Sequence, residues 1–154
     1  MFNVPTVTVA KTTLDGTSSS VTLDYAAPLG VSWTPRHLVV RVGTKSVGAE
    51  QDVFIQFNGD TANNYNYQRV IGYGTTVAGE RITNYGSQKF ATSPVSTVAE
   101  EFSSGEMLIP DALSTRSHKS TVSLTGNIED RVSAYTGRWA DTAAITSVTL
   151  TQNS

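Results

Sequence analysis

The stretch at residues 52–69, DVFIQFNGDTANNYNYQR, constrains the fold more than any other part of the chain. Its first half alternates apolar Val53, Ile55 and Phe57 with other residues, which is the period of a β-strand that has one buried face. A dense cluster of turn-forming residues follows, and a second apolar run then begins. This arrangement is typical of an all-β domain.

Short runs of this kind, separated by turn residues, recur along the chain. Besides residues 52–57, we predict strands at residues 6–14, 20–25, 38–42, 67–73, 106–109, 121–125, 132–140 and 144–151. The run at residues 38–42 is nearly continuous, as in a central strand. Residues 75–93 have weak periodicity and are predicted to form a long surface loop with one short strand around residues 80–84. Residues 94–102 have apolar side chains at helical spacing and are predicted to form one short helix.

The pattern fixes the class of fold. About eight to ten short strands fit a sandwich or barrel of antiparallel strands in one domain covering residues 1–154, with residues 1–5 as an N-terminal arm. A doubly wound α/β fold is excluded because no segment between strands can hold its crossover helices. Only 16% of the residues are charged, and Ser and Thr fill the shortfall, which also favours strands.

Composition excludes several classes of partner. The net charge is −2 and the eleven basic residues are scattered, so we predict no nucleic-acid partner. No apolar run approaches the roughly 20 residues of a membrane span, and the N-terminal residues MFNVPTVTVAK do not resemble a signal peptide. The chain has no cysteine, which excludes disulfides, thiolate metal sites and cysteine nucleophiles.

Catalytic patterns are also missing from the sequence. His37 and His118 lie in no metal-ligand spacing, and we interpret His37 as a partly buried side chain that closes a strand end. No GxSxG motif marks a nucleophile. The acidic pairs at residues 100–101 and 129–130 are neighbours at loop ends, unlike the separated carboxylates of a glycosidase. We therefore predict no catalytic residues, no cofactor and no metal.

The turn cluster allows two interpretations. Its members are Asn58, Gly59, Asp60, Asn63 and Asn64. Their side-chain oxygens could surround a calcium ion, but the cluster contains only one carboxylate, which is few for that cation. Asn and Asp also tolerate left-handed backbone and hydrogen-bond to their own main chain, so the same residues make a structural turn. We favour the structural turn.

Four tyrosines near this turn form a second candidate set: Tyr65, Tyr67, Tyr73 and Tyr85. Tyrosine offers a large contact area and a hydroxyl, so the set could form a surface for a protein partner or for glycans. Packing in the core is the alternative explanation for some of them.

The segment FNGDTANNYNYQRV at residues 57–70 closely resembles a motif, roughly FNGDTGxNYxYQ, of small structural proteins of tailed bacteriophages. Three further segments agree with that family: the HL pair at residues 37–38, GEMLIPD at 105–111, and GRWADTAAITSVTL at 137–150, which resembles GxWxxTxAITxxxL. Family members often continue into a terminal LYG strand, whereas this chain ends at Ser154. The difference suggests a strand supplied by a neighbour or an edge left open for another subunit.

The resemblance implies a jelly-roll-like sandwich that belongs to the virion and is assembled in the host bacterial cytoplasm. We expect a non-enzymatic capsid decoration (cement) protein that binds the major capsid protein, or another virion protein, and forms homo-oligomers such as trimers. Residues 1–5 and 75–93 are the expected contacts, because termini and loops usually carry them. The alternative is a tail or fibre module that binds host glycans through residues 65–85.

Overall fold

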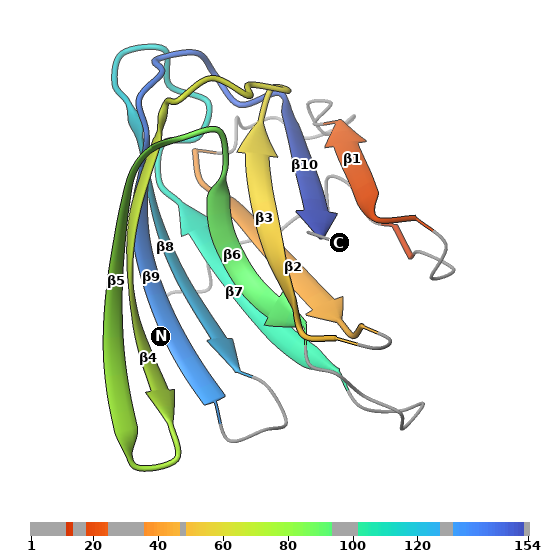
Figure 1. The fold of residues 1–154 in the computed structure, drawn as a ribbon. Helices are drawn as coiled ribbons and strands as arrows, with labels where there is room; N and C mark the ends of the chain where they lie inside the picture. Colours follow the sequence, from red (N-terminus) through yellow and green to blue (C-terminus); the bar gives the residue numbers. More distant parts are fainter. Residues whose placement is uncertain are drawn as a thin grey trace, which may run out of the picture.

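The structure is a computed structural model that describes residues 12–13, 18–24, 36–46, 49–93, 102–126 and 131–152. These residues form ten strands and contain no helix (Figure 1). The strands are β1 (Ser20–Asp24), β2 (Leu38–Thr44), β3 (Gln51–Phe57), β4 (Tyr65–Tyr73), β5 (Thr76–Tyr85), β6 (Gln88–Ser93), β7 (Ser103–Ile109), β8 (Lys119–Gly126), β9 (Arg131–Trp139) and β10 (Ser147–Gln152). The predicted all-β class is confirmed. In the described residues no helix is long and apolar enough to cross a membrane.

The strands form two antiparallel sheets that pack face to face. One sheet has the order β1-β10-β3-β6, and the other has the order β2-β7-β8-β9-β4-β5 (Figure 1). Strands close in sequence pass repeatedly from one sheet to the other, as in a jelly roll, and the β8–β9 hairpin widens the second sheet to six strands. The predicted jelly-roll-like sandwich is therefore confirmed.

The core lies between the sheets and is richest in aromatic side chains near the β3–β4 turn. Phe57, Tyr65 and Trp139 are almost completely buried, and their rings contact one another with centroids 5.5–6.4 Å apart. Ile145 and Val148 extend this cluster from the last strand and the segment before it.

The prediction of a long loop at residues 75–93 is wrong. These residues form β5, a ten-residue strand paired with β4, and β6, which pairs with β3. The sequence of β6, QKFATS, has no alternation because all six of its residues are buried. The sequence of β5 has little apolar content because it is an exposed edge strand. Neither strand therefore shows the two-residue period used to find the others.

Two further expectations need correction at residues 37–42. β2 lies at the edge of the six-stranded sheet and not at its centre. Its run of apolar residues arises because Val40 faces the core while Val39, on the opposite face, is 39% exposed. His37 is exposed, and its Nδ1 accepts a hydrogen bond from the Asp111 backbone N–H at 3.2 Å. The arm predicted at 1–5, the helix at 94–102 apart from Phe102, and the strand at 6–14 apart from residues 12–13 lie outside the described residues; residues 12–13 are not in a strand.

Candidate functional site

The turn between β3 and β4 is organised by positive backbone φ angles at Asn58 (55°) and Gly59 (67°). Such angles favour Asn and Gly, which explains this pair of residues. The backbone N–H of Asp60 donates to the Phe57 carbonyl at 2.9 Å and closes the turn. The side-chain oxygen Asn58 Oδ1 accepts hydrogen bonds from the backbone N–H groups of Thr146 and Ser147 at 2.7 and 3.1 Å. The turn thus holds the segment that leads into β10.

Asp60 connects this turn to the end of β9. Its Oδ2 accepts hydrogen bonds from Trp139 Nε1 at 2.7 Å and from Asn64 Nδ2 at 2.9 Å, and its Oδ1 accepts one from the Ala62 backbone at 2.8 Å. Burial alone would raise the pKa of the Asp60 carboxyl, but the hydrogen bonds from Trp139, Asn64 and Ala62 together lower it. The carboxylate is therefore held in its ionised form by donors of the chain itself.

These contacts bear on the two interpretations of the turn cluster. The side-chain oxygens of Asn58 and Asp60 already serve protein donors, and Asn64 Nδ2 binds Asp60, while Asn63 is exposed. In the described residues no group of three or more His, Cys, Asp or Glu side chains could hold a metal ion. We refer to Asn58, Asp60, Tyr65 and Trp139 as the turn hub. It joins two of the segments quoted for the phage resemblance, residues 57–70 and 137–150.

The four candidate tyrosines do not form one surface. Tyr65 is fully buried, and its hydroxyl accepts a hydrogen bond from the Phe57 backbone at 2.8 Å and donates one to the Asp60 carbonyl at 3.2 Å. Tyr67 is also buried, and burial raises its pKa to about 12. Tyr73 and Tyr85 are about half exposed but lie at opposite ends of the β4–β5 hairpin. The expectation of a shared aromatic platform is therefore corrected.

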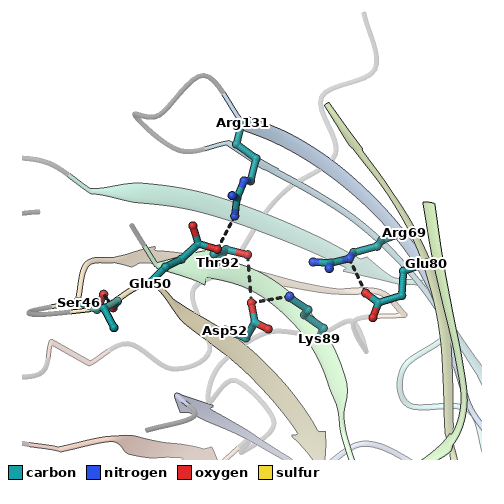
Figure 2. Close-up of polar contacts among 9 residues, drawn as sticks. Ser46, Glu50, Asp52, Arg69, Glu80, Lys89, Thr92 and Arg131 are labelled. Carbon is teal, nitrogen blue, oxygen red and sulfur yellow. Dashed lines mark hydrogen bonds and ion pairs between the residues drawn. The ribbon is translucent and has the colours of Figure 1, made fainter. Parts of the chain in front are cut away.

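Charged side chains gather between the sheets beside β6 (Figure 2). Lys89 on β6 contacts Asp52 on β3 at 2.5 Å, and Thr92 also donates to Asp52. Arg131 on β9 pairs with Glu50 and so joins the two sheets. Arg69 on β4 pairs with Glu80 on β5, with Nε and Oε2 2.6 Å apart. Each of these three carboxylates is paired with a cation, so the ion pairs act as structural links between strands.

The strand β8 has polar residues on its buried face and apolar residues on its exposed face. Its polar residues Thr121, Ser123 and Thr125 face the core and are 1–7% exposed, whereas Val122 and Leu124 face outward and are 54% and 61% exposed. Register in a sheet is normally fixed by burying the apolar set of each strand. Here the apolar set is on the open side, so the outer face of β8 is the unusual feature of this sheet.

Inward polar groups on β8 are supported by specific contacts. Buried Lys119 donates from Nζ to the backbone carbonyls of Ser114, Ser117 and Thr142 at 2.7–3.2 Å. Thr121 Oγ1 donates to Gln88 Oε1 at 2.8 Å. Burial lowers the pKa of Lys119, while Asp141 and Asp111 act in the opposite direction. These bonds fix the register that turns Val122 and Leu124 outward.

The apolar character continues across the whole outer face of the six-stranded sheet. Of the ten exposed large hydrophobic side chains in the described residues, seven lie on this face: Val39, Leu108, Val122, Leu124, Val132, Val70 and Val77. We call this surface the outer face. The six strands span roughly 24 Å at about 4.8 Å per spacing, and the outward residues of β9 span about 20 Å along the strand. The surface therefore has a projected area of roughly 500 Å², with polar and apolar side chains counted together.

Charges on the outer face are few. Arg41 and Glu106 lie side by side on β2 and β7 and neutralise each other at 2.6 Å. Arg81 and Arg138 are exposed towards the end of the face near the β3–β4 turn. The face is uncharged around Ala134 on β9 and Val70 on β4, whereas Glu106 on β7 lies directly opposite Leu124.

Comparisons of the chain with protein-family models, with curated proteins and with solved structures each found no match. The resemblance to phage structural proteins therefore stays a prediction from motifs.

Sequence reasoning found the residues of the turn hub but missed the outer face. The signal was present on β8, where the alternation of Val122 and Leu124 was recognised but not the direction in which they point. Alternation reveals that one face is apolar, and only the paired strands reveal which face that is.

Proposed function

We propose that this protein is a non-enzymatic virion structural protein of a tailed bacteriophage, a capsid decoration protein that binds the outside of the head. The observation that carries the proposal is the outer face, which exposes seven large apolar side chains to solvent across six strands, beside the charged residues Arg41, Glu106, Arg81 and Arg138. The motif resemblance and the jelly-roll sandwich, an architecture found among viral capsid proteins, support it. Fold alone would not, because this architecture serves many functions.

The proposed mechanism is adhesion across a seam. The outer face covers apolar surface of neighbouring major capsid subunits, so separating those subunits also requires exposing both apolar surfaces to water. The sandwich keeps its shape in this role because its own core does not depend on the outer face. The protein acts in the virion as a homo-oligomer and is assembled onto the head in the host cytoplasm.

The alternative, glycan binding by a tail or fibre module, is less well supported by the geometry. The glycan-binding hypothesis rests on the four candidate tyrosines, of which Tyr65 and Tyr67 are buried. Tyr73 is stacked under Arg131, whose guanidinium carbon lies 5.3 Å from the ring centroid, and Tyr85 contacts Phe54.

Co-sedimentation tests the proposal. The protein is mixed with expanded empty heads assembled from the major capsid protein encoded in the same genome, and the pelleted fraction is measured. We expect the native protein to pellet with heads and the V122S/L124S double variant to lose at least about tenfold in affinity, since two exposed aliphatic groups leave the contact. The T22A/T149A variant, which changes the outward side of the other sheet, is the control and should bind like the native protein.

Two outcomes would contradict the proposal. Native protein that stays in the supernatant would remove head binding altogether. Binding to a glycan array without binding to heads would favour the tail or fibre alternative.

A further inference from the structure

We propose that a second copy of this chain pairs with the free edge of β5, antiparallel about a two-fold axis at Gly79. This inference rests on the proposed function, since it specifies how the homo-oligomer forms and why the outer face becomes large enough to bridge subunits. It replaces the expected trimer by a dimer.

No other described strand pairs with the outer edge of β5. Among the strands that the structure describes, β5 pairs with β4 alone, and eight of its ten residues are exposed, with Val77 at 74%. The segment contains no proline, which would block pairing along a strand. A long exposed edge presents unpaired N–H and C=O groups to any chain that can add a strand.

A charged side chain that points to the inner side of a sheet commonly prevents another strand from adding to the edge. On β5 this charge is neutralised. Glu80 points to the inner side of the sheet, but Arg69 on the neighbouring strand pairs with it at 2.6 Å. A strand that adds to β5 therefore meets a neutral pair at this position and not an isolated carboxylate.

Charge limits how two copies of β5 can align. In a two-fold antiparallel pair, residues directly opposite each other share a face, and like charges in that position are destabilising. An axis at Glu80 would place the two Glu80 carboxylates opposite each other, and an axis at Arg81 would do the same to the two guanidinium groups. An axis at Gly79 places Glu80 opposite Ala78 and Arg81 opposite Val77. An axis at Ile82 also avoids like-charge pairs.

An axis at Ala78 also avoids like-charge pairs but would pair only residues 76–80 of the strand, so the shape of β5 has to decide between the axes at Gly79 and Ile82. Its pairing with β4 shifts between Tyr65 and Tyr67, so residues 83–85 lie beyond an irregularity that twists the strand. The axis at Gly79 pairs residues 76–82, which is the regular part of the strand. The axis at Ile82 would require residues 79–85, including the irregular end. The geometry therefore favours the axis at Gly79.

The pairing also supplies area that one copy lacks. One outer face offers roughly 500 Å², below the roughly 800 Å² per partner of a specific interface. A pair joined through β5 extends the six-stranded sheet of one copy into that of the other and places the two outer faces side by side, roughly 1,000 Å² in total. A surface of that width can span two capsid subunits, which is what a bridging protein needs.

Cross-linking of the full-length protein tests the register directly. The chain has no cysteine, so G79C introduces the only thiol, and a Cβ at this position would lie 3.8 Å from the Arg69 carbonyl oxygen, which is ordinary contact. Opposite residues in an antiparallel pair have Cα atoms about 4.5–5.5 Å apart, which suits a disulfide. We expect G79C to form a covalent dimer under mild oxidation, whereas V77C and T83C, on the same face, should not.

A charge exchange gives a second, independent test. Sedimentation should show the native protein at twice the mass of one chain. V77R places a cation opposite Arg81 twice in the dimer, and we expect it to weaken dimerisation about tenfold. Adding R81E makes both contacts attractive and should restore the dimer. Val77 is so exposed that the fold should be unaffected, which thermal unfolding of each variant checks.

Native protein that remains monomeric at tens of micromolar, or that forms a trimer, would overturn the inference. So would a cross-link through V77C or T83C in place of G79C. These measurements use purified protein without heads, so their failure is distinguishable from a failure to bind heads.

Discussion

The turn hub and the outer face are built in opposite ways. In the hub, the side-chain oxygens of Asp60 and Asn58 accept hydrogen bonds from donors within the chain. Trp139 and Tyr65 are buried, and their polar atoms are hydrogen-bonded. On the outer face, Val122 and Leu124 are surrounded by open solvent. The hub requires particular residues because its bonds are directional, whereas the face requires only apolar side chains at alternate positions. The motifs at residues 57–70 and 137–150 meet in the turn hub, although Val70 and Leu108 show that motif segments also reach the outer face.

The comparison predicts that stability and binding are separable. Substitutions in the hub should lower the free energy of unfolding without changing the chemistry of the outer face. Substitutions on the face should change binding and leave the free energy of unfolding nearly constant.

The largest effect is expected for Trp139→Ala. The substitution removes a buried ring and one of the three hydrogen-bond donors of Asp60, so the free energy of unfolding should fall by about 3–5 kcal/mol. Trp139→Phe keeps a ring and removes only the indole N–H, so it should cost about 1–3 kcal/mol. Urea denaturation followed by circular dichroism measures both. Equal losses for the two variants would show that the hydrogen bond, and not the ring packing, dominates the hub.

Gly137→Ala should have the next largest effect. A Cβ at this position would lie 2.6 Å from Gln88 Nε2, and Gln88 is completely buried, so it has no room to move away. Overpacking of this kind should cost about 1–3 kcal/mol in the free energy of unfolding. In a double-mutant cycle with Gln88→Ala the cost of the alanine at 137 should largely disappear. Additive losses would show that the strain has another origin.

The extent to which sequence predicted the structure follows from the same contrast. The strands predicted at residues 52–57 and 132–140 lie within a few residues of the observed bounds because apolar residues alternate visibly in their sequences. β6 was missed because it is buried on both faces, and β5 because its exposed edge position removes the need for apolar residues. The outer face was missed because its direction depends on pairing between distant strands, which no local pattern contains.

A smaller effect, dependent on pH, is expected from Asp60→Asn. The amide oxygen can still accept from Trp139 and Asn64, but its NH2 group replaces the oxygen that accepts from the Ala62 N–H and places two donors together, so we expect a loss of about 1–2 kcal/mol at neutral pH. The pKa of Asp60 is lowered in the folded state, so its contribution is fully present above the ordinary carboxyl pKa. It is lost as the pH falls through the lowered value. The difference between native protein and variant should therefore shrink as the pH falls below the ordinary carboxyl pKa and through the lowered value, as measured by unfolding at a series of pH values. If the difference in the free energy of unfolding did not depend on pH, protonation of Asp60 would not be what weakens the turn hub.

The smallest effect on stability is expected for V122S/L124S, the variant that should lose at least about tenfold in affinity for heads. Both side chains are more than half exposed, so the free energy of unfolding should change by no more than about 0.5 kcal/mol. The reciprocal change, Thr121→Val, lies one residue away on the inner face and removes the bond to Gln88, so it should cost more although it makes the strand more apolar. If serine at 122 and 124 were strongly destabilising and valine at 121 were not, the direction of β8 would be reversed. The apolar side chains of β8 would then belong to the core, and the outer face would lose the residues at its centre.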